Sequence, residues 1–235
     1  MPMPAGPSRP QAWMSWSSGK DSALALHEVR TTGAVEVVAL LTSVNVETER
    51  VAMHGVRRSL LEAQALALDL PLHMVELPWP CPNATYEQQM NEALRTARSG
   101  GVEAMVFGDL FLDDIRRYRE ASLLGSGITP LFPLWQRPTS ALAQDLIEQG
   151  FRALVVCVDL AQAPSSLAGR WFDHSLLAEL PPGVDPCGEN GEFHTVVVDG
   201  PGFAHSIDVV VGETIERDGF AFTDVLPTKE SSARR

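Results

Sequence analysis

Patterns of buried strands alternate with patterns of amphipathic helices over the first half of the chain, and this alternation restricts the fold more than any other feature. Val35–Leu41 is rich in β-branched residues, as in strands that are covered on both faces. Helical spacing is found at Ser22–Arg30, Arg57–Leu70 and Tyr86–Ala97, and further strand-like runs are Ala12–Trp16, Leu72–Leu77 and Ala104–Phe107. Strands joined by helices of this length predict βαβ units and a parallel sheet.

The second half of the chain has a different pattern, which begins at the proline-broken run P-L-F-P-L-W at 130–135. It predicts one helix and four strands, at Ala141–Gln149, Arg152–Val158, Phe193–Val198, His205–Val211 and Phe220–Val225. We therefore expect an α/β fold, in which a Rossmann-like parallel sheet is followed by a smaller C-terminal α+β domain. The expected domains span 11–135 and 136–227, and residues 1–10 and 228–235 are expected to be disordered ends.

The charge of the chain argues against a nucleic-acid partner. Its 30 acidic residues outnumber the 18 lysines and arginines, which gives a net charge of −12 at pH 7. Nucleic-acid binding instead draws its affinity from cations that neutralise phosphates. Because arginine far outnumbers lysine and alanine is abundant, the composition is typical of a GC-rich bacterial genome.

The sequence predicts neither export nor membrane insertion. No apolar run approaches the roughly 18–20 residues that cross a bilayer, and the proline-rich N-terminus lacks the apolar centre of a signal peptide. Cys81, Cys157 and Cys187 are far apart and form no C-x-x-C pair, so we expect neither disulfides nor a zinc site. We expect a cytoplasmic protein.

The first predicted strand ends in a loop formed by Ser17, Ser18, Gly19, Lys20, Asp21 and Ser22. Open α/β sheets bind their ligands at this edge. Gly19 lets the backbone approach a ligand, and the N-terminus of the following helix attracts anions. The hydroxyls and the Lys20 ammonium complete a site suited to phosphate. The loop is not a Walker A motif, because Met14 and Asp21 stand where that motif needs glycine and Ser or Thr.

An alternative interpretation of the loop is a Ser or Asp N-cap followed by an incidental lysine. The distribution of lysine favours phosphate binding instead. Lys20 and Lys229 are the two lysines among the 18 cationic residues, and a compact ammonium fits a narrow phosphate cradle better than the wide fork of arginine. We therefore predict that Lys20 binds phosphate.

The loop resembles the S-G-G-K-D-S loop of the PP-loop ATP pyrophosphatases, a branch of the adenine-nucleotide alpha-hydrolase superfamily. It departs from that loop at Ser18, where many members have glycine. Three further segments, in this order, resemble the ATP-binding domain of the diphthine–ammonia ligase family. They are M-H-G-V at 53–56 with A-Q-A at 63–65, F-G-D at 107–109 with the residues that follow it, and C-G-E-N-G-E-F-H-T at 187–195. The resemblance covers about residues 12–225.

This resemblance implies a ligase that uses ATP and Mg²⁺. The family activates a carboxylate as an acyl-adenylate, releases pyrophosphate, and lets ammonia displace AMP to give an amide. The loop at 17–22 would bind the phosphates, with Lys20 as a catalytic residue that stabilises the leaving pyrophosphate. Thr42 and Ser43, expected just after the second strand, would contact adenine or ribose.

The segment at 187–195 carries two glutamates with two possible roles. The resemblance makes Glu189 and Glu192 catalytic, because they could orient a substrate or accept a proton from ammonium, while Gly188 and Gly191 leave room for the acceptor. The alternative is a turn at Asn190-Gly191 flanked by two solvated glutamates.

Further site residues follow the strand at Ala104–Phe107. Gly108 and Asp109 would contact ATP, with Asp109 meeting a ribose hydroxyl or Mg²⁺; the alternative is an Asp that initiates the next helix. Arg116 and Glu120 would contact the substrate in a cleft between the domains. Their spacing of four residues equally allows a surface ion pair.

The expected partners are ammonia and a small or protein-bound carboxylate, and a homodimer is possible. Diphthine occurs on an archaeal or eukaryotic translation factor, so the bacterial composition leaves the acceptor open. Two other functions compete with the ligase. One is a tRNA-modifying PP-loop enzyme, which the net charge of −12 disfavours. The other is a non-catalytic adenine-nucleotide-binding regulator, which would need neither the K-D-S loop nor the two glutamates.

Overall fold

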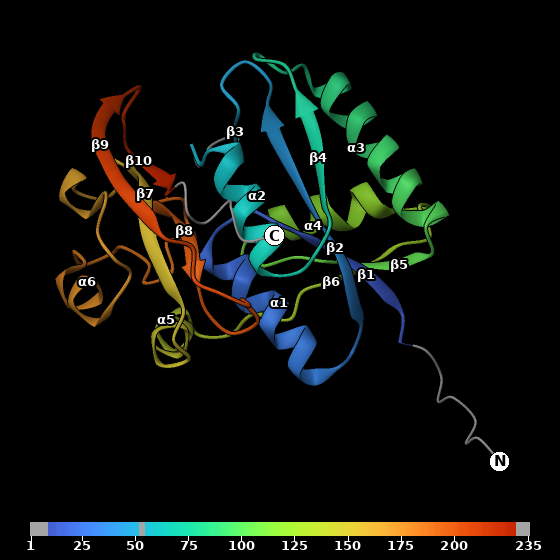
Figure 1. Ribbon diagram of the computed structural model, residues 1–235, viewed down its shortest axis with the longest axis horizontal. Helices are drawn as coiled ribbons and strands as arrows, with labels where there is room; N and C mark the ends of the chain where they lie inside the picture. The colour runs from blue at the N-terminus through green and yellow to red at the C-terminus, as the bar shows by residue number, and fades with distance from the viewer. Residues whose placement is uncertain (1–8, 52–54, 229–235) are drawn as a thin grey trace.

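The computed structural model describes residues 9–51 and 55–228, and its chain forms two sheets (Figure 1). The first sheet contains β1 (Gln11–Ser15), β2 (Glu36–Asn45), β3 (Arg50–Val51), β4 (Leu72–Leu77), β5 (Val102–Val106) and β6 (Thr129–Leu131). The second contains β7 (Arg152–Asp159), β8 (Phe193–Asp199), β9 (Val209–Arg217) and β10 (Phe220–Pro227). Most of both predicted disordered ends, together with Met53, His54 and Lys229, lies outside the described residues.

The first sheet is mostly parallel. β1 pairs with β2 and β5 in parallel, β2 with β4, and β5 with β6. The predicted parallel sheet is found, with one antiparallel addition that the sequence did not predict, because β3 runs antiparallel to the end of β2. The reason is local: Asn45 Oδ1 accepts hydrogen bonds from the N–H groups of Glu47 and Thr48, each at 2.9 Å, and so turns the chain back on itself.

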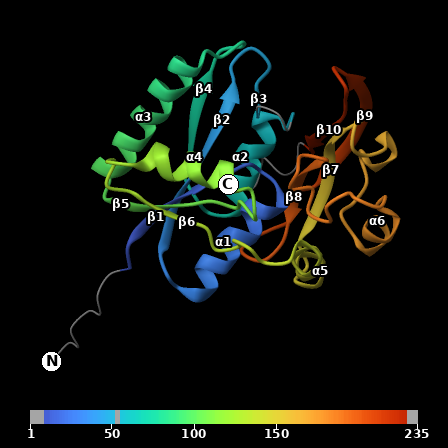
Figure 2. The same ribbon diagram turned by 180° about the vertical axis from the view of Figure 1, so that it is seen from behind.

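Helices cover both faces of this sheet, as Figures 1 and 2 show from opposite sides. α1 (Lys20–Thr32) and α2 (Arg58–Ala67) place Leu24 and Leu60 in the core that is shared with the second sheet. α3 (Asn83–Ser99) and α4 (Asp113–Leu123) place Leu94 and Leu123 in a separate core with Met105. The predicted α/β architecture is confirmed.

The second sheet is antiparallel, in the order β8-β7-β10-β9, and has α5 (Thr139–Glu148), a 3₁₀ turn (Ser165–Leu167) and α6 (His174–Glu179) beside it. This confirms the smaller α+β unit. The strand predicted at His205–Val211 is wrong in its bounds, because β9 begins at Val209 and runs to Arg217. β9 pairs with β10 alone among the described strands and exposes Val210 and Ile215, so it lacks the buried alternation that marks a strand in sequence.

Four other predictions concern the chain as a whole. None of the helices in the described ranges is long and apolar enough to cross a membrane. The predicted boundary between residues 135 and 136 falls between β6 and α5. The boundary, the cytoplasmic location and the homodimer stay predictions.

Candidate active site

A cavity of about 230 Å³ opens at the carboxyl ends of β1 and β5, between the first turn of α1, the start of α4 and the segment 187–195. Both halves of the chain line it. The predicted site residues in its walls are Ser17, Gly19, Lys20, Asp21, Ser22, Gly108, Asp109, Gly188 and Glu189. The structure therefore brings together the loop after β1, the end of β5 and part of the segment that carries the two glutamates.

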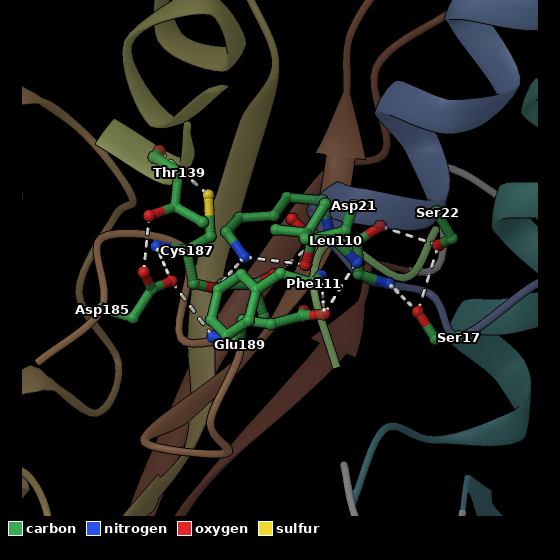
Figure 3. Close-up of polar contacts among 12 residues, drawn as sticks. Ser17, Asp21, Ser22, Leu110, Phe111, Thr139, Asp185, Cys187 and Glu189 are labelled. Carbon is green, nitrogen blue, oxygen red and sulfur yellow. Dashed lines mark hydrogen bonds and ion pairs between the residues drawn. The ribbon is translucent and has the colours of Figure 1, made fainter. Parts of the chain in front are cut away.

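The loop after β1 is held by its own hydroxyls (Figure 3). Ser17 Oγ accepts a hydrogen bond from the Gly19 N–H at 3.3 Å and donates to Ser22 Oγ at 3.1 Å, and Ser22 Oγ donates to the Gly19 carbonyl at 2.9 Å. Ser18 has a φ of 73°, a left-handed conformation that costs energy for any residue with a side chain. Glycine, which many PP-loop pyrophosphatases have here, adopts this conformation without that cost.

The capping interpretation of the loop differs from the arrangement that the structure shows. The N-cap of α1 is Gly19, which has no side chain, and the Lys20 N–H donates instead to Thr195 Oγ1 of β8 at 3.1 Å. A Cβ on Gly19 would lie 3.1 Å from the Thr195 carbonyl oxygen. Glycine at this position thus lets β8 approach the helix N-terminus.

Lys20 is 2% exposed, and its ammonium lies where the two halves of the chain meet. Nζ donates to Asp21 Oδ2 at 2.9 Å and to the Cys187 carbonyl (Figure 3). It also lies 5.4 Å and 5.6 Å from the ring centroids of Phe172 and Phe193. Burial alone lowers the pKa of Lys20, but the neighbouring negative charges, led by Asp21, outweigh burial and raise it. The ammonium is therefore charged at neutral pH.

Glu189 points into the cavity, where its Oε1 accepts hydrogen bonds from the N–H groups of Leu110 at 2.7 Å and Phe111 at 3.4 Å (Figure 3). Asp185 Oδ1 accepts from the Glu189 N–H at 3.2 Å and so fixes its backbone. Burial raises the pKa of Glu189 to about 7, with Asp21 adding to the rise and the two N–H groups opposing it. A carboxyl with this pKa gains and loses a proton near neutrality.

Asp109 follows β5 and lies in the same cavity. Its Oδ2 is buried without a hydrogen-bond partner in the described part of the chain, and the nearest cation, Arg119, places Nε 3.6 Å away. Burial raises the pKa of Asp109, and Arg119 opposes that rise. Only glycine fits at position 108 without a clash, because a Cβ there would lie 2.9 Å from backbone atoms of Asp21 and Ser22 in the first turn of α1.

Glu192 and Gly191 are not in the cavity wall. Glu192 is buried, and its Oε1 accepts from the Asp185 N–H at 2.8 Å and from Asn190 Nδ2 at 2.9 Å. The Gly191 N–H donates to the Gly188 carbonyl at 3.1 Å, so a turn forms with Glu189 and Asn190 at its centre. The alternative of a turn at Asn190-Gly191 flanked by two solvated glutamates is therefore wrong, because the turn lies one residue earlier and Glu192 is buried. The catalytic role predicted for Glu192 and the substrate contact predicted for Gly191 stay predictions, which these positions do not support.

Thr42 and Ser43 lie within β2, not after it, because β2 continues four residues beyond the predicted end at Leu41. They pair with Met74 and Val75 of β4. The Leu41 carbonyl accepts a hydrogen bond from the N–H of Trp16, the residue that follows β1. Backbone groups two residues apart point to the same edge of a strand. The Ser43 carbonyl therefore lies on the same edge of β2 as the Leu41 carbonyl, which is the edge that faces the end of β1.

Arg116 and Glu120 are also absent from the cavity wall. Arg116 Nε lies 2.8 Å from Glu120 Oε1, which is the surface pair that their spacing allows. The guanidinium also packs on the rings of Phe132 and Trp135, at 4.9 Å and 4.7 Å from their centroids. Their predicted contact with a substrate stays a prediction.

Sequence reasoning missed two residues that position the loop. One is Thr195, which receives the Lys20 N–H. The other is Gln64 of α2, which is fully buried: its Nε2 donates to the carbonyls of Ser18 at 3.0 Å and Val197 at 2.6 Å, and its Oε1 accepts from Trp16 Nε1 at 2.8 Å. Both residues belong to segments that carry the family resemblance, A-Q-A and F-H-T, and that was the available signal.

Comparison with known proteins relates both halves of the chain to the two domains of one family. The family model described as the diphthamide synthase N-terminal domain matches residues 11–127, and the diphthamide synthase C-terminal domain matches residues 138–227. The chain is 32% identical over 130 residues to the diphthine–ammonia ligases of Bos taurus and Homo sapiens, covering 53% of this chain and 48% of each relative.

A third relative is matched over a longer stretch. The chain is 25% identical over 223 residues to the diphthine–ammonia ligase of Schizosaccharomyces pombe, covering 85% of this chain and 36% of that protein. The chain therefore spans about half or less of the length of the curated relatives it matches.

Proposed function

The chain belongs to the diphthamide synthase family, and we propose that it forms an amide from a carboxylate and ammonia with the use of ATP. A carboxylate oxygen attacks the α-phosphorus of ATP, and the bond from that phosphorus to the bridging oxygen breaks as pyrophosphate leaves. Ammonia then attacks the acyl carbon, AMP leaves, and one proton is released. The acceptor is a small or protein-bound carboxylate, which need not be diphthine.

One observation carries this proposal: the N-terminus of α1, the buried ammonium of Lys20 and the carboxyl of Glu189 converge on one cavity. A helix N-terminus with a fixed cation suits a polyphosphate. Negative charge that develops on departing pyrophosphate is stabilised by such preorganised groups. Because Lys20 and Glu189 come from different halves of the chain, a substrate between them would contact both.

The adenosine of ATP fits a second cavity. This cavity has a volume of about 440 Å³ and lies between α3 and α4, over Leu41 of β2 and the carboxyl ends of β1 and β5. Its walls include Leu41, Tyr86 and Met90, apolar or aromatic side chains of the kind that hold a purine. It shares lining residues with the first cavity, which supports one ATP molecule with its phosphates at Lys20 and its adenosine in the second cavity. The edge of β2 at Ser43 lies two residues beyond Leu41.

Asp109 fits the Mg²⁺ that the family resemblance implies. Its Oδ2 is buried without a hydrogen-bond partner among the residues described, and Asp21 lies in the same cavity. The described residues contain no group of three or more side chains able to hold a metal by themselves. Mg²⁺ commonly takes one or two carboxylates and completes its shell with substrate phosphates and water. We propose Asp109 as that carboxylate, and Mg²⁺ would supply positive charge to the phosphates.

Glu189 is proposed to serve the second half-reaction. Ammonium must lose a proton before its nitrogen can attack the acyl carbon. A carboxylate with a pKa of about 7 is able to accept that proton near neutral pH. The N–H groups of Leu110 and Phe111 hold its Oε1, and the carboxylate thus has a fixed direction in the cavity.

The competing functions have less support. A thiolating PP-loop enzyme needs a reactive cysteine, but burial raises the pKa of both Cys157 and Cys187, which makes each a poor nucleophile at neutral pH. A net charge of −12 also opposes a tRNA substrate. A non-catalytic regulator would have no use for the carboxyl of Glu189 beside the nucleotide.

The test is the identity of the nucleotide product. The protein is incubated with labelled ATP, Mg²⁺, ammonium and a library of carboxylic acids that includes a diphthine-bearing protein. We expect AMP and pyrophosphate, lost in Lys20→Ala and retained in Arg58→Ala, which removes a surface cation paired with Glu62. Formation of ADP, or no turnover with any acid, would contradict the proposal.

A further inference from the structure

The two cavities meet at three residues, Ser15, Phe107 and Arg119, which line both. Arg119 is the charged member of the three and reaches the junction from α4. Tyr86 lines the second cavity together with Arg119. A ligand that extends from one cavity into the other therefore passes the Arg119 guanidinium.

This guanidinium is held by a ring contact and a long ion pair, neither of which is a hydrogen bond. Its Cζ lies 5.1 Å from the centroid of the Phe107 ring, and its Nε lies 3.6 Å from Asp109 Oδ2. That Nε is buried and has no hydrogen-bond partner within the described ranges. Arg137, by comparison, forms a close ion pair, in which Nη1 lies 2.7 Å from Glu28 Oε1. A buried donor without a partner costs free energy, so an anionic oxygen at the junction would be bound favourably.

We propose that Arg119 binds the α-phosphate of ATP and is a further catalytic residue. The assignment rests on the proposed function, in which the β- and γ-phosphates meet Lys20 and the adenosine occupies the second cavity. The α-phosphate joins those two parts of ATP and so lies at the junction. Arginine can contact two phosphate oxygens with its planar fork. Negative charge at the α-phosphate during attack by the carboxylate is stabilised by a cation fixed in advance.

Binding of a nucleotide series tests this assignment without relying on turnover. Calorimetry compares adenosine, AMP and the non-hydrolysable β,γ-imido analogue of ATP on the whole chain. Arg119→Gln is expected to weaken AMP binding by about tenfold or more, because a charge-assisted hydrogen bond is lost, and to leave adenosine binding unchanged. Lys20→Ala is expected to weaken binding of the ATP analogue while AMP binding changes little.

A matched control lies two residues away on the same helix. Arg117 is exposed and its Nε donates to the Asp113 carbonyl, so Arg117→Gln removes the same charge from α4 away from the junction. All three affinities should match the wild type. Arg119→Lys provides a second variant that keeps the charge but loses the fork; we expect weaker AMP binding with unchanged adenosine binding, and it carries the test if Arg119→Gln fails to fold.

The outcomes separate this assignment from the proposed function. If the wild type binds AMP more tightly than adenosine and both Arg119 variants keep that difference, the α-phosphate does not contact Arg119 and the assignment alone is overturned. Equal weakening of adenosine and AMP would overturn it as well, since the loss would then not involve the phosphate. If the wild type binds none of the three ligands, both the assignment and the proposed function fall.

Discussion

The backbone N–H of Lys20 donates a hydrogen bond to the hydroxyl of Thr195, 3.1 Å away, although 175 positions separate the two residues in the chain. The first residue of α1 is thereby fixed by β8 of the second sheet. The Val197 N–H, two residues further along β8, donates to the Ser18 carbonyl at 2.9 Å. The conformation of the phosphate-binding loop thus depends on both halves of the chain.

Replacing Thr195 tests this dependence. Thr195→Val keeps the shape of the side chain but leaves the buried Lys20 N–H without its acceptor, which should lower the free energy of unfolding by about 1–3 kcal/mol. We also expect weaker ATP binding, because the helix N-terminus would no longer be held. Urea denaturation and calorimetry measure the two effects. Thr195→Ser restores the hydroxyl and should restore both properties; a Ser variant as impaired as the Val variant would contradict this account.

Glu189 should make stability depend on pH. Its pKa is about 7 in the folded protein against 4.5 for an unperturbed glutamate. Between these values the folded state holds a proton that the unfolded state has released, so this group lowers the free energy of unfolding as pH rises from about 5 to about 7. Glu189→Gln removes that contribution.

Urea denaturation of both proteins at several pH values between 5 and 8 measures the contribution of Glu189. The stability of the wild type relative to Glu189→Gln should fall across this range and level off above pH 7. Parallel stability curves for the two proteins would show that the pKa of Glu189 is not raised.

Ser18 should be a site where glycine stabilises the protein. The left-handed φ of 73° strains any side chain, and Ser18 Oγ is buried without a hydrogen-bond partner among the described residues. Ser18→Gly should raise the free energy of unfolding by about 1 kcal/mol, or the melting temperature by about 2–4 °C. Ser18→Ala removes the hydroxyl but keeps the strain, so it should gain less. An Ala variant as stable as the Gly variant would count against the strain.

Gly108 should tolerate no side chain. In Gly108→Ala the new Cβ would lie 2.9 Å from the backbone of Asp21 and Ser22, so the first turn of α1 must move. We expect ATP affinity to fall by about tenfold or more, since misplaced phosphate donors lose their charge-assisted bonds. Gly100→Ala is the control, because its Cβ would be 3.4 Å from its nearest neighbours. Unchanged ATP affinity in Gly108→Ala would show that this contact does not position the loop.

Part of the fold followed directly from local patterns. The strand predicted at Leu72–Leu77 has the same bounds in the structure, because apolar residues interrupted by the exposed His73 and Glu76 directly after Pro71 are typical of a half-buried strand. The loop around Lys20 was also recognisable, since its residues are contiguous. Both features are set by residues that are adjacent in the sequence, so they can be recognised without the structure.

The remainder of the site depends on contacts between distant segments. Glu189 and Glu192 are the same residue type three positions apart, and the turn between them directs one into the cavity and the other onto Asn190. Gln64 has a polar side chain in a buried helix, but its partners lie on two other segments, the stretch that follows β1 and strand β8. Arg119 belongs to no motif, and the meeting of two cavities beside it is a property of the fold alone.

The central claim is that ATP activates a carboxylate by transferring its adenylyl group. The most direct measurement uses acceptor acids labelled with ¹⁸O in the carboxyl group, incubated with the protein, ATP, Mg²⁺ and ammonium, followed by mass spectrometry of the nucleotide. We expect AMP that carries one ¹⁸O atom, with no such product in Lys20→Ala. Unlabelled AMP, or ¹⁸O found in phosphate beside ADP, would contradict it.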